Sequence, residues 1–340
     1  DDTKNEKCYP FEKRDDLMAK SFTSLDTVTK NIKENISPIP AIKQFEKIEP
    51  LKLSSNILEN FIKYSNLESE NERSLSPEEY FYKGVALSES GNYNEAISMY
   101  KKAIEKDPKF FRAMNNLGTV YNKLGNYLDA ERELMRALEI KPNDDIILNN
   151  LGDVYSNQGK YEEAIKYFMQ AIDKNKKQPK YYYNLGNIYN AIDEYDKAIE
   201  IYEKALNFDN NQAEVLNNLG ISYYEKEEFL TSEKYFRQSI EADPNYLNAY
   251  HNLALIHHKN NELQQALDCY NEIIKRNPKT NLNAFYNRSC TYALLNNKSL
   301  MIEDLKKAID INPKAKIEAR TDEDFQKYRD DPDFIELTSQ

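Results

Sequence analysis

The sequence predicts an all-α protein whose helices come in repeated pairs, that is, an α-solenoid. The first observation is a period of 34 residues that starts at Pro77 and continues almost to the C-terminus. The second is that apolar residues within each period follow helical rather than strand spacing. The third is a recurring glycine, at Gly84, Gly118, Gly152, Gly186 and Gly220. A fixed period of this length is typical of stacked supersecondary units.

Each period predicts two helices joined by a turn, as the second one shows. Its first helix is expected over residues 111–124, where the apolar positions are Met114, Leu117, Val120, Tyr121 and Leu124. Gly125 and Asn126 interrupt the pattern, and a second helix is expected over residues 127–140. Pro142 follows, as is common just beyond a helix terminus.

Small and large residues recur at separate positions of the period. The small position of the second helix holds Ala96, Ala130, Ala164, Ala198 and Ala266, with Ser232 once in its place. A large position holds Tyr100, Leu134, Phe168, Tyr202, Phe236 and Tyr270. A glycine inside a helix costs about 1 kcal/mol relative to alanine, so its recurrence predicts a close neighbouring helix. We therefore expect the large residues to pack against the small ones.

These positions resemble the tetratricopeptide repeat, a 34-residue motif with Leu-Gly, Tyr, Ala and Phe landmarks. The third unit shows the pattern best, at Leu148, Leu151, Gly152, Tyr155, Gly159, Tyr161, Ala164, Phe168 and Ala171. Seven units are expected, at 77–110, 111–144, 145–178, 179–212, 213–246, 247–281 and 282–315. The resemblance covers about 240 residues and implies a right-handed superhelix of antiparallel helix pairs.

The segments on either side of the repeats carry separate expectations. Residues 1–76 lack the repeat positions; helices are expected at about 11–36 and 54–64. This segment is interpreted as a tail, as a cap on the first unit, or as a recruiting or self-associating segment. Residues 316–340 are expected to form a polar capping helix, because the last unit would otherwise expose its apolar face. Lys176 and Asn210 stand where other units have proline, which predicts looser turns there.

One polar position recurs without an evident packing role. It holds Asn116, Asn150, Asn184, Asn218, Asn252 and Asn287. An asparagine amide offers both a donor and an acceptor. The family resemblance places this position on the concave face and implies hydrogen bonds to the backbone of an extended peptide. The alternative, compatible with the first, is that the asparagines bond neighbouring helices to each other.

Two adjacent positions are expected to share that face. The residue before each asparagine is Phe81, Asn115, Asn149, Tyr183, Asn217, His251 or Tyr286. Four residues after these come Val85, Thr119, Asp153, Asn187, Ile221, Leu255 and Cys290. Neither position holds a lysine or an arginine, which disfavours the carboxylate-binding subfamily and an acidic tail as ligand. Besides the six asparagines, the peptide-binding candidates are Asn115, Asn149, Tyr183, Asn187, Asn217 and Tyr286.

Composition and motifs exclude several function classes. The net charge of −11 disfavours nucleic acid and anionic membranes as partners, and no apolar run is long enough to span a bilayer. No Walker loop, GxSxG motif or convergent metal ligands are present, so no cofactor, metal or catalytic residue is expected. The three cysteines, Cys8, Cys269 and Cys290, include no CxxC pair, and Cys269 and Cys290, on adjacent predicted helices, are interpreted as small apolar fillers. The chain begins at Asp1, which leaves open a removed signal or anchor and a cytoplasmic or periplasmic location.

The sequence thus predicts a non-catalytic scaffold that binds peptide segments of partner proteins in a concave groove. One alternative is a structural component of a membrane- or motor-associated assembly, acting through the convex face or residues 1–76. A second is the recognition arm of a transferase, which the absence of a catalytic segment in this sequence disfavours.

Overall fold

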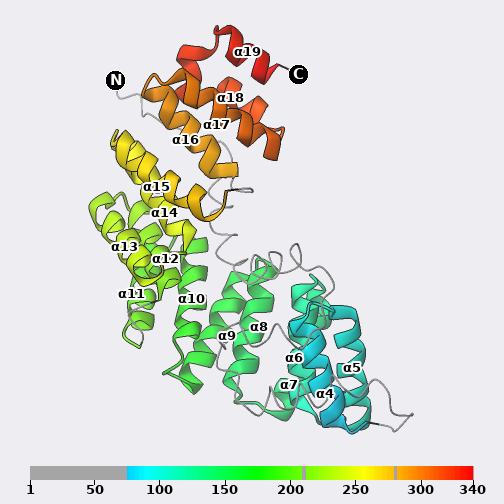
Figure 1. The fold of residues 1–340 in the computed structure, drawn as a ribbon. Helices are drawn as coiled ribbons and strands as arrows, with labels where there is room; N and C mark the ends of the chain where they lie inside the picture. The colour runs from blue at the N-terminus through cyan, green and yellow to red at the C-terminus, as the bar shows by residue number, and fades with distance from the viewer. Residues whose placement is uncertain (1–74, 209–211, 279–281, 340) are drawn as a thin grey trace. The chain divides into compact units, whose positions relative to one another are not determined.

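The computed structural model describes residues 75–208, 212–278 and 282–339 (Figure 1). These residues form sixteen α-helices, α4 to α19, and one 3-10 helix, η3, and they contain no strand. The all-α prediction is therefore confirmed. The expected helices at 11–36 and 54–64, and the turn at Asn210, lie outside the described residues. The chain divides into two compact units, one ending at Ile188 and the other starting at Tyr189.

The first unit consists of three helix pairs and most of a seventh helix. The pairs are α4 (Pro77–Glu89) with α5 (Tyr93–Lys106), α6 (Phe111–Lys123) with α7 (Tyr127–Ile140), and α8 (Asp145–Asn157) with α9 (Tyr161–Lys174). Helix α10 (Pro179–Ala191) follows them. The expected helices of the second repeat agree with α6 and α7 to within one residue. Ser76 starts the array with a capping box, in which its side chain and that of Glu79 each accept from the other's backbone N–H.

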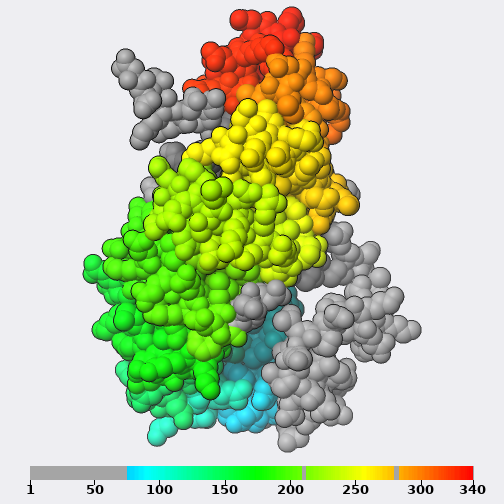
Figure 2. All heavy atoms as spheres, turned by 90° about the vertical axis from the view of Figure 1, so that its left-hand side faces the viewer, coloured from blue at the N-terminus to red at the C-terminus, as the bar shows by residue number. Residues whose placement is uncertain are grey.

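The second unit continues the pairing and ends in three short helices. Its repeat helices are α11 (Tyr195–Leu206), α12 (Ala213–Glu225), α13 (Phe229–Ala242), α14 (Leu247–Lys259), α15 (Leu263–Arg276), α16 (Leu282–Leu294) and α17 (Lys298–Ile311). Figure 2 shows the atoms of successive pairs in contact along the visible face of this unit. The terminal helices are α18 (Ala315–Thr321), η3 (Glu323–Tyr328) and α19 (Pro332–Thr338).

The turn inside each helix pair contains one residue in the left-handed backbone region. In the second repeat this residue is Gly125, with φ of +76°. The next N–H, that of Asn126, donates to the Tyr121 carbonyl at 2.9 Å, the arrangement by which helices commonly end at a glycine. Later repeats place Asp193, Glu227, Asn261 and Asn296 in the same conformation. Each first helix thus stops and the chain reverses into its partner.

The recurring glycines make room for the recurring large residues. A Cβ atom built on Gly152 would lie 2.5 Å from the Phe168 ring, closer than real Cβ contacts allow. The same holds for Gly84 against Tyr100, Gly118 against Leu134 and Gly220 against Phe236. The predicted packing of large on small residues is therefore confirmed in these four repeats.

Serine replaces the recurring alanine once and the recurring glycine once, and in neither case is its buried hydroxyl left unpaired. Ser232, at the alanine position, donates its hydroxyl to the Gly220 carbonyl at 2.7 Å. Ser289, at the glycine position of the seventh repeat, donates to the Met301 carbonyl at 2.8 Å. Both side chains are buried. A hydroxyl is tolerated at these positions because the backbone of a packed helix offers it an acceptor.

The segment after the repeats is three short helices rather than the one helix expected for residues 316–340. Asp331 lies between η3 and α19 and caps α19, because its carboxylate accepts from the Asp333 N–H at 3.0 Å. Phe325, Tyr328 and Phe334 are buried in one cluster with residues of α16 and α17, among them Met301 and Leu305. The apolar face of the last helix pair is covered in this way.

A candidate peptide-binding face on the first helices

The first helices of neighbouring repeats contact each other within each unit. Helix α6 touches both α4 and α8, and in the other unit α12 touches α14. These helices carry the asparagine position and the two positions next to it. We call the surface formed by those three positions the first-helix face, and we describe it separately in each unit.

The asparagines of the first-helix face bond neighbouring repeats to each other. In the first unit, Asn150 Nδ2 donates to Asn115 Oδ1 at 2.8 Å, and Asn184 Nδ2 donates to Asn149 Oδ1 at 2.9 Å. In the second unit, Asn252 Nδ2 donates to Asn217 Oδ1 at 2.8 Å. Each bond joins residues 35 positions apart in the sequence. We call these bonds amide rungs; they are the inter-helix alternative that the sequence left open.

The amide rungs divide the predicted site residues by accessibility. Asn149, Asn184, Asn187, Asn217, Asn218 and Asn252 are buried, whereas Asn115, Asn116, Asn150, Tyr183 and Asn287 are only partly buried. Tyr286 is fully buried and donates its hydroxyl to Asp322 Oδ2 at 3.0 Å. A ligand on this face would therefore contact the partly buried side chains first. The buried amides hold neighbouring side chains in place through the rungs.

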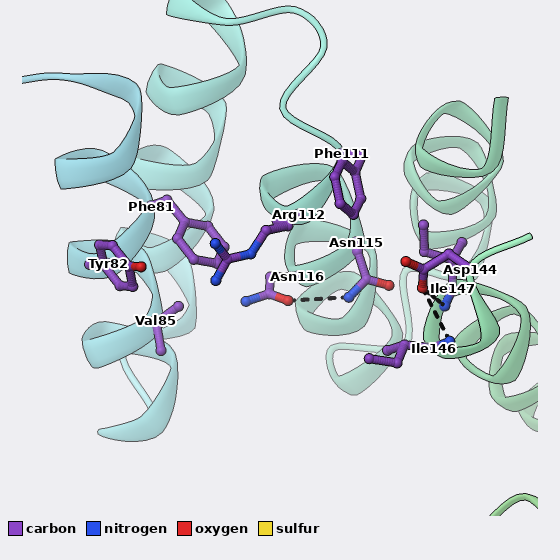
Figure 3. A pocket seen from close by; sticks show the side chains of 10 residues that line it. All are labelled: Phe81, Tyr82, Val85, Phe111, Arg112, Asn115, Asn116, Asp144, Ile146 and Ile147. Carbon is purple, nitrogen blue, oxygen red and sulfur yellow. Dashed lines mark hydrogen bonds between the residues drawn. The ribbon is translucent and has the colours of Figure 1, made fainter. Parts of the chain in front are cut away.

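A cleft of about 280 Å³ opens on the first-helix face between α4, α6 and α8. Figure 3 shows the side chains around it: Phe81, Tyr82, Val85, Phe111, Arg112, Asn115, Asn116, Asp144, Ile146 and Ile147. The predicted residues Asn115 and Asn116 thus line one cleft, with Asn115 Nδ2 donating to Asn116 Oδ1 at 3.2 Å. Aromatic and aliphatic groups from α4 and α8 form its other walls.

Two charged residues of the cleft were missed by the sequence analysis. The Arg112 guanidinium lies over the Phe81 ring, 4.7 Å from its centroid. Asp144 caps α8, its carboxylate accepting from the N–H groups of Ile146 and Ile147 at 3.2 and 3.1 Å. Neither residue belongs to a recurring position. The available signal for Arg112 was its place four residues before Asn116, one turn away on the same side of the helix.

Asp153 accepts from both amides of the rung between Asn184 and Asn149, and the pKa of its carboxyl is raised. Its Oδ1 accepts from Asn184 Nδ2 at 3.1 Å and its Oδ2 from Asn149 Nδ2 at 3.2 Å. Burial raises the pKa of this carboxyl to about 7, although Lys180 and the Asn149 amide act in the opposite direction. An unfolded chain has an aspartate pKa of about 3.9. The folded protein therefore holds a proton between these two values that the unfolded chain has lost.

We expect Asp153→Asn to flatten the dependence of stability on pH. In the wild type, the stabilisation linked to the Asp153 proton is fully present below the unfolded pKa and is lost as the pH rises through the folded pKa. An amide keeps the shape but has no proton to lose. Urea unfolding at pH 5 and pH 8 should show a smaller difference for the variant. Asp173→Asn, at an exposed position, is the control that should behave as wild type; an unchanged difference in Asp153→Asn would contradict the assignment.

Histidine and cysteine side chains of the repeats lie in packed surroundings. His257 is buried, with its Nδ1 atom 2.5 Å from Glu262 Oε2 and its Nε2 atom 3.3 Å from Arg237 Nη2. Cys269 and Cys290 are buried and form no disulfide, and burial raises the pKa of the Cys269 thiol to about 12.

Among the described residues, no helix combines the length and apolar character needed to span a bilayer.

Comparison with known proteins addresses the family and the fold. A tetratricopeptide repeat model matches residues 110–177, 144–211, 179–245 and 211–279, a second matches 84–125, and a third matches 282–315. A search of curated proteins found no match.

Three solved structures have the same kind of fold. A tetratricopeptide repeat protein from Parabacteroides merdae is 19% identical with a TM-score of 0.56, over 78% of this chain and 99% of that one. The C-terminal part of a repeat protein from Cytophaga hutchinsonii is 19% identical with a TM-score of 0.54, over 70% and 98%. The pilF protein of Pseudomonas aeruginosa is 21% identical with a TM-score of 0.53, over 60% and 93%. At these identities the likeness concerns the fold alone. The repeat models, which together match most of the chain, show that it belongs to the tetratricopeptide repeat family.

Proposed function

We propose that this protein is a non-catalytic scaffold that binds peptide segments of partner proteins along the first-helix face. The family supports a protein-interaction scaffold in general. The observation that carries the more specific proposal is the cleft between α4, α6 and α8, because it combines apolar walls with accessible amides. Concave sites of this composition are the usual place for ligands.

The size of the cleft favours a peptide side chain over a cofactor. Pockets for drug-sized ligands usually measure about 300–1,000 Å³, and this cleft, at about 280 Å³, lies just below that range. Phe81, Val85 and Ile146 suit an apolar anchor residue of the peptide. Arg112 stands beside them and can pair with a carboxylate or a carbonyl oxygen next to that anchor. The preferred segment is therefore an apolar residue flanked by an acidic one.

The amide rungs contribute to binding by fixing side chains before the peptide arrives. Asn115 accepts from Asn150 and donates to Asn116, so three amides are held in one orientation. Binding to an amide that is already fixed costs less conformational entropy than binding to an amide side chain that the ligand must first order.

The test is peptide selection on the full chain, followed by affinity measurements on variants. Peptides chosen from a random display library would be labelled and titrated by fluorescence anisotropy. We expect Arg112→Ala and Ile146→Ser each to weaken binding at least tenfold, and the peptides to contain an apolar residue next to an acidic one. Ile146 is 55% exposed, so its replacement leaves the core intact.

The chain offers a matched control for the amides. Asn157 Nδ2 donates to Asn122 Oδ1 at 3.0 Å across the same 35-residue spacing, but neither residue lines the cleft. Asn116→Ala should weaken the selected peptides and Asn157→Ala should not. Equal affinity in all four variants would remove the cleft from the proposal, and failure to select any peptide on the wild type would overturn the proposed function.

A further inference from the structure

The second unit ends with side chains that can ligate a metal ion, at positions where the repeats carry amides or other small groups. Asp322 lies 36 residues after Tyr286 and accepts from the Tyr286 hydroxyl. Cys290 occupies the position that holds Thr119 and Asp153 in earlier repeats. Asp324 of η3 and His258 of α14 complete the group.

Three of these side chains, Cys290, Asp322 and Asp324, lie close together, and the fourth, His258, lies beside Asp324. One potential ligand atom from each of Cys290, Asp322 and Asp324 lies within 4.8 Å of the others. Cys290 Sγ is 3.6 Å from Asp322 Oδ2, and His258 Nε2 is 3.2 Å from Asp324 Oδ2. The side chains of His258 and Asp324 are only 10% and 1% exposed. The group is enclosed rather than a cluster of surface carboxylates.

Two buried atoms of this group have no hydrogen-bond partner among the described residues. They are His258 Nε2 and Asp324 Oδ2, which approach each other without hydrogen-bond alignment. A buried polar atom left in this way costs roughly 1–3 kcal/mol, and buried charges are normally paired or bound to a metal. A cation shared between these two atoms would satisfy both of them.

The carboxylates around this group also favour a bound cation. Glu318, whose backbone carbonyl accepts from the Asp322 N–H at 3.0 Å, has a buried carboxylate oxygen with no hydrogen-bond partner among the described residues. The Arg329 guanidinium donates to the backbone carbonyls of Thr321 and Asp322, at 3.0 and 3.3 Å. The Asp322 and Asp324 carboxylates lie within 4.8 Å of each other, and a bound cation would relieve the repulsion between them.

Two of the separations in this group match those of neighbouring ligands on a tetrahedral ion. Zinc bonds of about 2.3 Å to sulfur and about 2.0–2.2 Å to oxygen place those two ligand atoms about 3.5 Å apart in a tetrahedron. With a bond of about 2.0 Å to nitrogen, the nitrogen and oxygen atoms lie about 3.3 Å apart. The structure has 3.6 Å for Cys290 and Asp322, and 3.2 Å for His258 and Asp324.

We propose that Cys290, Asp322, Asp324 and His258 form a binding site for a zinc-type divalent cation. A thiolate and an imidazole favour zinc or cobalt over calcium and magnesium, which prefer oxygen ligands alone. Binding releases the thiol proton of Cys290 to solvent, because the thiolate is the ligand. The ion would connect α14, α16 and η3, and so fix the C-terminal segment to the last repeats. This site shares no residue with the cleft of the proposed function.

The proposal is tested by metal titration of the full chain. The protein would be freed of metal with a chelator and titrated with zinc by calorimetry, and separately with cobalt by absorption spectroscopy. We expect one equivalent of zinc to bind and to raise the melting temperature. Cobalt should give a thiolate-to-metal charge-transfer band, which requires a sulfur ligand.

Variants separate this site from other binding. Cys290→Ser and Asp324→Asn should each weaken zinc at least tenfold, and Cys290→Ser should abolish the charge-transfer band. Cys269→Ser, at the other buried cysteine of the unit, and Cys8→Ser are controls that should bind as wild type. Asp324→Asn keeps the size of the side chain, so it serves if Cys290→Ser does not fold. The proposal is overturned if no equivalent binds, if both site variants retain wild-type affinity, or if a control cysteine removes the band.

Discussion

Replacing Phe325 by alanine is expected to lower the free energy of unfolding of the C-terminal end by about 3–5 kcal/mol, the usual cost of truncating a buried phenylalanine. Phe325 is fully buried, with its ring centroid 5.9 Å from that of Tyr286 and 5.5 Å from that of Phe334. It therefore joins α16, η3 and α19. Hydrogen exchange should show lost protection first in α16 to α19, because each repeat is stabilised chiefly by its neighbours.

The control for Phe325 is a large apolar residue of the same segment that packs less. Ile335, on α19, is 46% exposed, and Ile335→Ala should change stability by no more than about 0.5 kcal/mol, as surface substitutions usually do. If Phe325→Ala left exchange in α16 and α17 unchanged, the C-terminal segment would not stabilise the last repeat.

The second large effect is expected at a buried ion pair between α16 and α17. Arg288 Nε and Nη2 donate to the two carboxylate oxygens of Asp304 at 2.6 and 2.9 Å, and the Asp304 side chain is only 3% exposed. Asp304→Ala would leave the Arg288 charge without this partner in a largely buried position. Breaking such a pair from one side costs about 3–5 kcal/mol, measurable as a lower urea midpoint.

A double variant distinguishes a lost pair from a lost charge. Arg288→Met combined with Asp304→Leu replaces both charges by apolar groups of similar size, a change that is often neutral or stabilising. We expect it to recover most of the stability that Asp304→Ala loses. A double variant as unstable as the single one would show that packing around these two side chains, and not the unpaired guanidinium, determines the loss.

The fold was predictable from the sequence because the period encodes it. Gly152 and Phe168 recur 16 residues apart in several repeats, and the same pairing follows in each because the same two helices meet. The amide rungs were only half predictable. Recurrence identified the position of Asn150, but its partner, Asn115, lies in the preceding repeat. Choosing that partner requires the spacing between stacked helices, which the sequence does not state.

Features that occur once were not predictable in the same way. Arg112 lines the cleft but belongs to no recurring position, and its place four residues before Asn116 is the one sequence feature that puts it on the same side of the helix. Asp322 lies beyond the last repeat, where the expectation was a simple polar helix. Its hydrogen bond with Tyr286, 36 residues earlier, depends on how the terminal helices pack against α16, which the sequence does not state.

The amide rungs also bear on how such an array can change its length. In each described rung, the later repeat supplies the donor and the earlier repeat supplies the acceptor. A tandem duplication of residues 145–178 would add one copy of Asn150 and one of Asn149, so every donor would still find an acceptor. Loss or gain of a few residues would instead shift one amide away from its partner and leave both unmatched. The amide rungs are therefore compatible with the gain or loss of whole repeats, and they are disrupted by insertions or deletions of a few residues.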